Sequence, residues 1–180
     1  MSAEVPASSS PSALRRAGHG LETKPWYAPH LKRYTLTMNK ISDKIYLGNS
    51  KDAANDFDLA QAGITAVLNV AIDLPCPVRK GIVSYRVGLY DGPGNPAGMF
   101  EAAVVTLGSL IEGDHTVLIH CHAGISRSPA VLAAYLTAKK GYGRIEPQVN
   151  ELAKIRGCVD PDNELLKLAQ AYVNKVVYRI

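Results

Sequence analysis

A cysteine and an arginine stand six positions apart in a short segment whose residue types suit the binding of a phosphate. The segment runs from Leu118 to Pro129 and reads LIHCHAGISRSP. An apolar run leads into it and the helix-forming run 130–140 follows, which predicts a strand, a tight loop and a helix start. Backbone N–H groups of such a loop point at one spot, where the helix dipole adds positive charge. This spot suits a phosphate, with Cys121 beneath it and Arg127 beside it.

These residue types can hydrolyse a phosphate ester. Cys121 is the candidate nucleophile, because the thiolate of a cysteine attacks readily. Arg127 has a planar fork that matches two phosphoryl oxygens, which a lysine lacks. Ser128 could donate to the sulfur and ease its departure from a phospho-cysteine. The remaining residues of the loop are expected to line the phosphate: His122, Ala123, Gly124, Ile125 and Ser126. Among them, the glycine fits a position where the backbone must turn sharply.

Two other interpretations of the segment are weaker. A metal site made of His120, Cys121 and His122 is disfavoured, because adjacent residues on a strand point to opposite faces. The chain also has no CxxC pair and no HExxH. An inert buried thiol with an unrelated surface arginine does not explain the glycine between them. We therefore expect no metal ion and no organic cofactor, and we expect His120 to fix the loop by bonding to its backbone.

The sequence resembles a known family at this point. Residues 120–128, HCHAGISRS, are similar to the HCxxGxxRS signature of the cysteine-based protein tyrosine phosphatases, in the version found in dual-specificity phosphatases. The resemblance extends from about Met38 to Tyr178, and includes ISDKIYLG at 41–48, GITAVLNV at 63–70, and Arg156 with PDN at 161–163. It implies a small atypical member that hydrolyses phosphotyrosine and phosphoserine or phosphothreonine through a phospho-cysteine. Asn69, in the second of these stretches, is predicted to support the site.

The leaving group needs a proton, and Asp91 is the best candidate to supply it. A positioned acid contributes roughly 10²–10⁴-fold to such a step. Asp91 lies in the turn-rich stretch 89–96, after the apolar run 82–89, and thirty residues before Cys121. In the resembling family the general acid lies on such a loop, at about this distance. Asp73 is the second candidate, and Asp114 should lie at the wrong end of the sheet. The simple alternative is that Asp91 is a turn aspartate that bonds its own backbone.

The order of the elements predicts an α/β fold. Strands are expected near 41–47, 64–71, 82–89 and 116–120, and helices near 51–62, 97–112, 128–140, 145–156 and 161–177. Asp160 should cap the last helix, with Pro161 in its first turn. This alternation predicts a central, mostly parallel sheet of about 4–5 strands with helices on both faces. Sites in such sheets lie beyond the carboxyl ends of the strands, where Cys121 and Asp91 both fall. Residues 38–180 should form the catalytic domain, and residues 1–37 a flexible N-terminal segment.

Charge and cysteine content limit the partners and the compartment. Residues 1–40 carry six Lys/Arg and two Asp/Glu, whereas residues 41–180 carry fourteen of each, so the net charge of +4 belongs to the N-terminal segment. A neutral domain argues against a nucleic-acid partner. The three cysteines, Cys76, Cys121 and Cys158, fit a reducing compartment, the cytoplasm or the nucleus. We expect Cys76 and Cys158 to be ordinary residues, no membrane span and no secretory signal.

The substrate class is open between several readings. The loop residues 122–126 include no lysine, whereas lipid-directed relatives often carry basic residues there, so phosphoproteins are favoured and a protein kinase is one candidate partner. One alternative is a phosphatase for a non-protein phosphate ester. Another is a pseudophosphatase, an adaptor that binds phosphoproteins without hydrolysing them. A thiol-based arsenate reductase or sulfurtransferase is a third alternative, which Asp91 and Ser128 disfavour.

Overall fold

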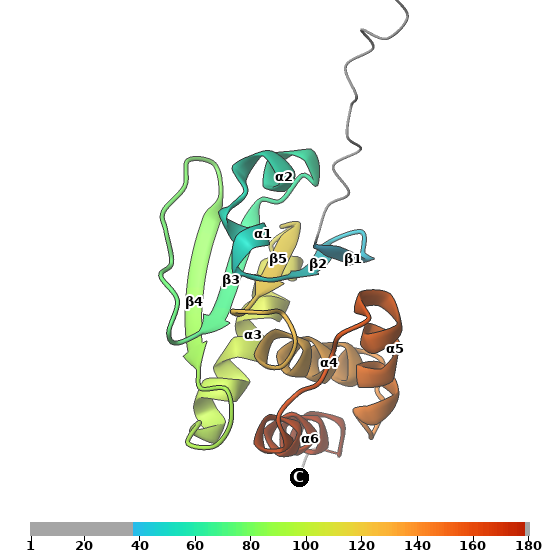
Figure 1. Ribbon diagram of the computed structural model, residues 1–180. Coiled ribbons are helices and arrows are strands. Elements are labelled where there is room, and N and C mark those ends of the chain that lie inside the picture. The colour runs from blue at the N-terminus through green and yellow to red at the C-terminus, as the bar shows by residue number, and fades with distance from the viewer. Residues whose placement is uncertain (1–37, 179–180) are drawn as a thin grey trace, which may run out of the picture. The chain divides into compact units, whose positions relative to one another are not determined.

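The computed structural model describes residues 38–178, so the segment 1–37 that the sequence predicts to be flexible lies outside the described residues. Within 38–178 the chain forms one sheet with helices around it (Figure 1). The strands are β1 (Asn39–Ser42), β2 (Ile45–Gly48), β3 (Ala66–Ala71), β4 (Val83–Leu89) and β5 (Val117–His120). The helices are α1 (Ser50–Ala54), α2 (Asp56–Gln61), α3 (Ala97–Glu112), α4 (Arg127–Lys139), α5 (Glu146–Arg156) and α6 (Asn163–Tyr178).

The sheet has the order β1-β2-β5-β3-β4 and is mostly parallel, which confirms the predicted architecture. Strand β1 pairs with β2 in the antiparallel direction, and all the other neighbours run parallel. The carboxyl ends of β3, β4 and β5 therefore meet at one edge. The segments that carry Asp73, Asp91 and Cys121 leave the sheet at this edge, so the topology alone gathers the three candidate residues.

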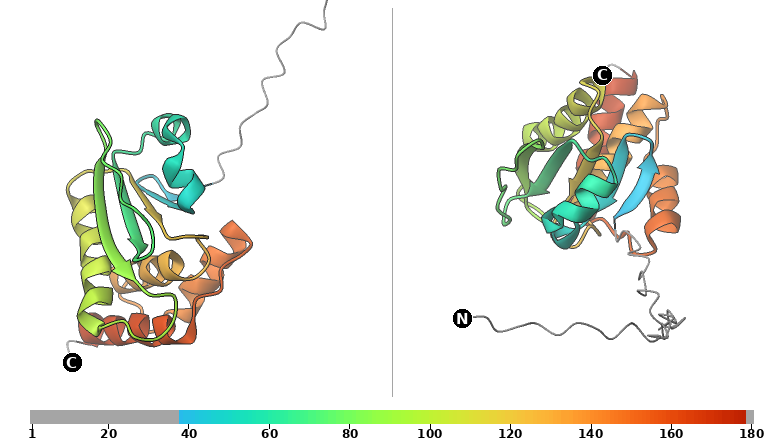
Figure 2. Two further views of the ribbon diagram at one scale, coloured as in Figure 1. Left: turned by 60° about the vertical axis from the view of Figure 1, so that its left-hand side comes forward. Right: turned by 90° about the horizontal axis from the view of Figure 1, so that it is seen from above.

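The two faces of the sheet follow from the alternation of side chains along each strand. Tyr46, Val67 and Leu118 are neighbours in register and belong to a small cluster with residues of α1 and α2. The alternate residues belong to a larger core with residues of α3, α4 and α6. Figure 2 shows these three helices on the side of the sheet opposite α1 and α2. Helix α3 buries an apolar stripe at helical spacing there: Phe100, Val104, Leu107 and Ile111. Burying one such side chain stabilises the fold by about 1.5–3 kcal/mol.

Two predicted elements are divided in the structure. The strand expected over 41–47 is a hairpin of β1 and β2 with a turn at Asp43 and Lys44. The helix expected over 51–62 is interrupted at Asn55, which ends α1 and caps α2 by accepting the Asp58 N–H at 3.2 Å. Asparagine favours such a cap because its side-chain oxygen satisfies an orphan N–H at the start of a helix.

The predicted cap of the last helix is wrong. Helix α6 begins at Asn163, and it is the Asp162 carboxylate that accepts the Glu164 N–H, at 2.8 Å. Asp160 lies before the helix, where its backbone N–H donates to the Ile125 carbonyl at 2.9 Å. The helix starts later than predicted because the backbone of this segment is hydrogen-bonded to the loop between β5 and α4, residues 121–126, which we call the phosphate loop after its predicted function. No helix between residues 38 and 178 has the length and apolar character that crossing a membrane requires.

Candidate active site

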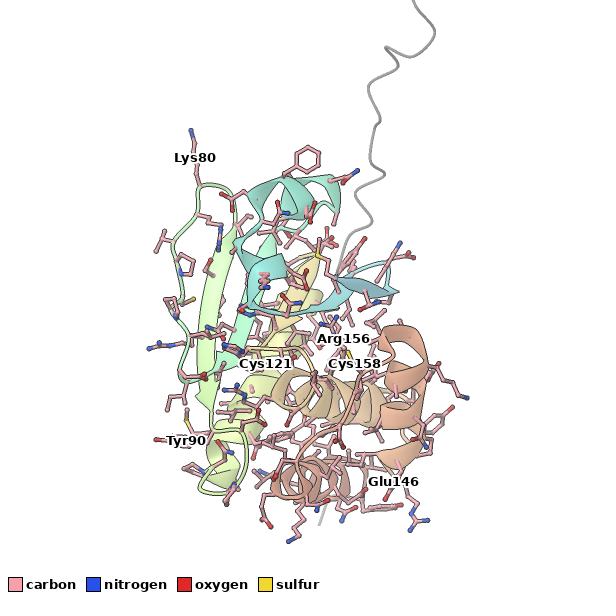
Figure 3. The ribbon with its side chains drawn as sticks, in the orientation of Figure 1. Lys80, Tyr90, Cys121, Glu146, Arg156 and Cys158 are labelled. Atoms are coloured by element: carbon pink, nitrogen blue, oxygen red, sulfur yellow. The ribbon has the colours of Figure 1, made fainter. Side chains whose placement is uncertain are left out.

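The loop between β5 and α4 holds Cys121 at the edge of the sheet where the parallel strands end. Cys121 is only 2% exposed. Its sulfur accepts the Gly124 N–H at 3.3 Å and the Ser128 hydroxyl at 3.2 Å. Figure 3 labels Cys121 at the end of its strand, above the start of α4. Two donors directed at one sulfur stabilise a negative charge on it, which is the state that a nucleophilic cysteine requires.

The carbonyl groups of residues 122–125 in this loop point outward, toward donors elsewhere in the protein. In a trans peptide the N–H points opposite to the preceding carbonyl, so outward carbonyls direct the following N–H groups inward. Such a concave set of N–H groups binds anions. The His122 carbonyl accepts the Ser50 N–H at 3.0 Å, and the Ile125 carbonyl accepts the Asp160 N–H at 2.9 Å. Arg156 donates to the other two carbonyls, from Nη2 to Ala123 at 3.2 Å and from Nε to Gly124 at 2.8 Å.

Arg156, at the end of α5, ties this loop to the sheet. Besides the two loop carbonyls, its Nη1 donates to the Asn39 side chain at 2.7 Å and to the Leu47 carbonyl at 3.2 Å (Figure 3). Gly124 has φ +71°, and a Cβ there would collide with the Gly48 carbonyl. The sequence singled out Arg156 only through the family pattern and gave it no role, because its contacts lie 32 to 117 residues away in the chain.

Arg127, the first residue of α4, has one buried N–H without a hydrogen-bond acceptor among residues 38–178. Its side chain is 6% exposed, and Nη1 donates to Asp73 at 2.5 Å and to the Leu89 carbonyl at 3.3 Å. Nε is buried and has no hydrogen-bond acceptor among the described residues, while the Asp91 carboxylate lies 3.7 Å from it. Asp73, the second candidate for the acid, is thus held by Arg127, whose hydrogen bond lowers the pKa of Asp73.

Asp91 lies on the loop after β4, beside the phosphate loop. Asn95 holds this loop, because its side chain accepts the Tyr90 N–H at 2.8 Å and donates to the carbonyls of Tyr90 and Gly92, both at 2.9 Å. The half-exposed Asp91 carboxylate accepts the Ser126 hydroxyl at 2.5 Å. The sequence did not predict this contact, since it joins two loops that are 35 residues apart.

His120 and Asn69 lie side by side in the register of β5 and β3. Nδ1 of His120 lies 3.2 Å from the Cys121 carbonyl, which can only accept, so Nδ1 carries the proton. Burial of the ring, which is 5% exposed, lowers the pKa of His120 to about 4. Asn69 instead bonds the carbonyls of Leu74 and Pro75, at 3.3 and 3.1 Å. It therefore steadies the loop that carries Asp73, and among residues 38–178 it makes no side-chain hydrogen bond to the loop between β5 and α4.

The remaining candidates lie around and away from this centre. His122 and Ala123 are exposed and Ile125 is half-buried. An open cleft of about 580 Å³ beside the loop between β5 and α4 is lined by Asp91, Ala123, Ile125, Ser126, Asp160, Pro161, Asp162 and Asn163. Asp114 pairs with Lys44 before β5 begins, at the far end of the sheet as predicted. Cys76, Cys121 and Cys158 are all free thiols.

Comparisons with known proteins agree with this geometry. The family model for the dual specificity phosphatase catalytic domain matches residues 45–174. Dual specificity protein phosphatase 22-A of zebrafish, Danio rerio, is 30% identical over 141 residues, which are 78% of this chain and 67% of that protein. Human dual specificity phosphatase 28 is 29% identical over 103 residues, 57% of this chain and 58% of the relative, so the match spans less than two thirds of that protein.

A solved structure shares the fold. The crystal structure of human DUSP28 has a TM-score of 0.71 and 23% sequence identity, and the match covers 79% of this chain and 99% of that one. The family match lies inside the segment 38–180 that the sequence assigned to the catalytic domain, while the boundary at residue 38 stays a prediction. The match over 45–174 and the zebrafish relative show that this chain belongs to the dual specificity phosphatase family, whose catalytic domain it contains.

Proposed function

We propose that this protein removes phosphate from phosphotyrosine, phosphoserine and phosphothreonine in proteins, through a phospho-cysteine on Cys121. The observation that carries the proposal is the set of contacts around one anion position. The sulfur of Cys121 accepts two hydrogen bonds, and the buried Nε of Arg127 has no hydrogen-bond acceptor in the described part of the chain. An equatorial phosphoryl oxygen is the acceptor that this N–H suits.

In the first step, the Cys121 thiolate attacks phosphorus opposite the leaving oxygen. The S–P bond forms as the P–O bond breaks, and Arg127 with the loop N–H groups holds the equatorial oxygens. Asp91 gives its proton to the leaving oxygen, so that a neutral hydroxyl side chain departs. Asp91 fits this role better than Asp73, because Arg127 already engages the Asp73 carboxylate.

In the second step, water attacks the phospho-cysteine. The Asp91 carboxylate takes a proton from this water, the S–P bond breaks, and inorganic phosphate leaves. Ser128 lies 3.2 Å from the sulfur, with its hydroxyl as the donor, and stabilises the thiolate as it departs. Both steps use only side chains and backbone of this chain together with water, and no metal ion or cofactor takes part.

The acidic cleft supports a protein substrate over other phosphate esters. Asp91, Asp160 and Asp162 line the open space beside the phosphate loop, and the loop residues 122–126 include no lysine or arginine. Carboxylates at this position repel polyanions such as phosphoinositides and RNA, whereas a peptide adds little charge beyond its phosphate. We therefore propose phosphoproteins, protein kinases among them, as substrates. The free Cys121 thiol suits a reducing compartment, and we propose the cytoplasm or nucleus.

A substrate panel with a nucleophile variant tests this proposal. Purified protein would be assayed against a phosphotyrosine peptide, a phosphothreonine peptide, a phosphoinositide and an RNA with a 5′ phosphate. We expect release of phosphate from both peptides, little from the other two, and none from any substrate with Cys121→Ser. Phosphopeptide binding without turnover by the wild type would instead indicate the adaptor. Faster turnover of the lipid or the RNA would contradict the protein substrate.

A further inference from the structure

The hydroxyl of Ser126 joins three parts of the site. Its oxygen lies 2.5 Å from Asp91 Oδ1 and 3.1 Å from the backbone nitrogen of Asp162. Ser126 is only 9% exposed, so water does not compete freely for these contacts. The serine directly before Arg127 therefore does more than line the phosphate. It links the loop that carries the acid to the segment that precedes α6.

The directions of these two hydrogen bonds follow from their partners. The Asp162 N–H can only donate, so the Ser126 oxygen accepts there. A hydroxyl has a single hydrogen, and among the described residues Asp91 Oδ1 is the one acceptor that it contacts. If a proton on Oδ1 donated to Ser126 instead, the serine hydrogen would be left without an acceptor in a buried position, which costs about 1–3 kcal/mol. Ser126 therefore donates to Oδ1.

This direction distinguishes the two oxygens of the Asp91 carboxyl group. Oδ1 accepts from Ser126, while Oδ2 lies 3.7 Å from Arg127 Nε, an N–H that has no hydrogen-bond acceptor among the described residues. We propose that Ser126 is a positioning residue for the general acid, which turns the Asp91 carboxyl group so that Oδ2 carries the proton to the leaving oxygen. The inference rests on the proposed role of Asp91 and adds how its geometry is set.

In this proposal the two serines beside Arg127 assist different steps of the reaction. Ser128 is fully buried and donates to the sulfur, which leaves in the second step. Ser126 donates to the acid, which acts on the group that leaves in the first step. Asp162 fixes the Ser126 oxygen, and its own carboxylate caps α6 through the Glu164 N–H at 2.8 Å. The position of the acid is thus anchored to the start of the last helix.

The test compares aryl phosphates whose leaving phenols differ in acidity. For kcat/KM, which reports the first step, we expect Ser126→Ala to lose about threefold with p-nitrophenyl phosphate and more than about tenfold with phenyl phosphate. Ser126→Thr keeps the hydroxyl and should restore both substrates to within about threefold of wild type. Vanadate occupies the phosphate position without needing the acid, so its inhibition should change less than about twofold in either variant.

Asp91→Ala and the double variant Asp91→Ala/Ser126→Ala distinguish a wrong role for Ser126 from a wrong role for Asp91. Asp91→Ala should lose most with phenyl phosphate, and adding Ser126→Ala to it should cause no further dependence on the leaving group, because the two residues act as one unit. An equal loss on all substrates for Ser126→Ala, or a parallel weakening of vanadate, would overturn the positioning role alone. An equal loss for Asp91→Ala as well would remove the general acid, and this inference with it.

Discussion

Arg127 and Asp73 form an ion pair of 2.5 Å inside the site, although 54 residues separate them in the chain. The pair uses Nη1 of the guanidinium and leaves Nε without a hydrogen-bond acceptor among residues 38–178. The arginine side chain is almost fully buried and the aspartate is half-exposed, so packing and the ion pair together hold the guanidinium in place. We therefore propose that Asp73 helps to orient the guanidinium group that would bind the substrate phosphate.

We expect Asp73→Asn to keep more of the catalytic activity than Asp73→Ala. Asp73→Asn keeps an oxygen acceptor for Arg127, so we expect kcat/KM to stay within about threefold of wild type, whereas Asp73→Ala should lose about tenfold through a misplaced guanidinium. Both values should be equal across aryl phosphates of different leaving-group acidity. A loss of 10² or more in Asp73→Asn that grows with poor leaving groups would make Asp73 the acid in place of Asp91.

Gly124 should be far less replaceable than Gly141. Both glycines have positive φ, +71° and +69°, but a Cβ at Gly124 would collide with the Gly48 carbonyl, whereas one at Gly141 meets nothing within 4 Å. Gly141→Ala should cost about 1 kcal/mol of unfolding free energy and leave activity intact. Gly124→Ala should cost more than about 2 kcal/mol and abolish turnover. Urea unfolding and phosphatase assays of the two variants measure the loss of stability and of activity. Similar losses of unfolding free energy at both positions would show that the phosphate loop can rearrange to accommodate the added Cβ.

Arg156 should not be replaceable by lysine. A single ammonium cannot match a planar group that donates to the carbonyls of Ala123, Gly124 and Leu47 and to the Asn39 side chain. We expect Arg156→Lys to lose about 1–3 kcal/mol of stability and to weaken vanadate inhibition about tenfold, because the loop loses its outward anchors.

Lys154→Ala is the matched control for this change. Lys154 is an exposed cation in the last turn of the same helix, so its removal should change the unfolding free energy by less than about 0.5 kcal/mol. If Arg156→Lys behaves like the control in both measurements, the loop does not depend on this guanidinium.

His120 should make stability depend on pH. The pKa of His120 is lowered to about 4 in the folded state by burial, while an unfolded chain has a value near 6.5. Between these two values the unfolded state binds the extra proton. The contribution of His120 to the free energy of unfolding is therefore fully present above about pH 6.5. As the pH falls from there toward 4, the free energy of unfolding decreases by up to about 3 kcal/mol.

The comparison with a His120→Asn variant isolates this effect. The asparagine amide can replace Nδ1 as donor to the Cys121 carbonyl but does not titrate. Urea unfolding at about pH 5 and about pH 7 should give a smaller pH dependence for the variant than for the wild type, since the contributions of Asp73 and the other carboxylates cancel between the two proteins. Equal pH dependence would show that His120 titrates normally.

Local patterns predicted the parts of the site that lie close together in the chain. The spacing of Cys121, Arg127 and Ser128 specified the loop, and the turn-rich stretch around Asp91 specified a second loop at the same edge of the sheet. Both could be read from the sequence because strand ends and turns have distinctive compositions. The sheet and its helices followed from the same alternation of apolar segments.

The contacts between loops could not be predicted in this way. Asp73 with Arg127, Ser126 with Asp91 and Arg156 with Gly124 join residues 32 to 54 positions apart. Which polar groups meet across these distances depends on how the segments pack, and no periodicity encodes it. The displaced cap of α6 has the same origin, because the pairing of Asp160 with Ile125 overrides the local preference for a cap two residues earlier.

The outward carbonyls of residues 122–125 have a consequence for inhibitors. All four have donors from the protein before any ligand binds, so folding itself gives the phosphate loop its final shape. The loop is therefore preorganised for a tetrahedral oxyanion, and it loses little conformational entropy when such an ion binds. Such a receptor distinguishes poorly among oxyanions of similar size. Selective compounds for this protein should gain their affinity outside the loop, with a cationic group directed at Asp160 and Asp162 in the adjoining cleft.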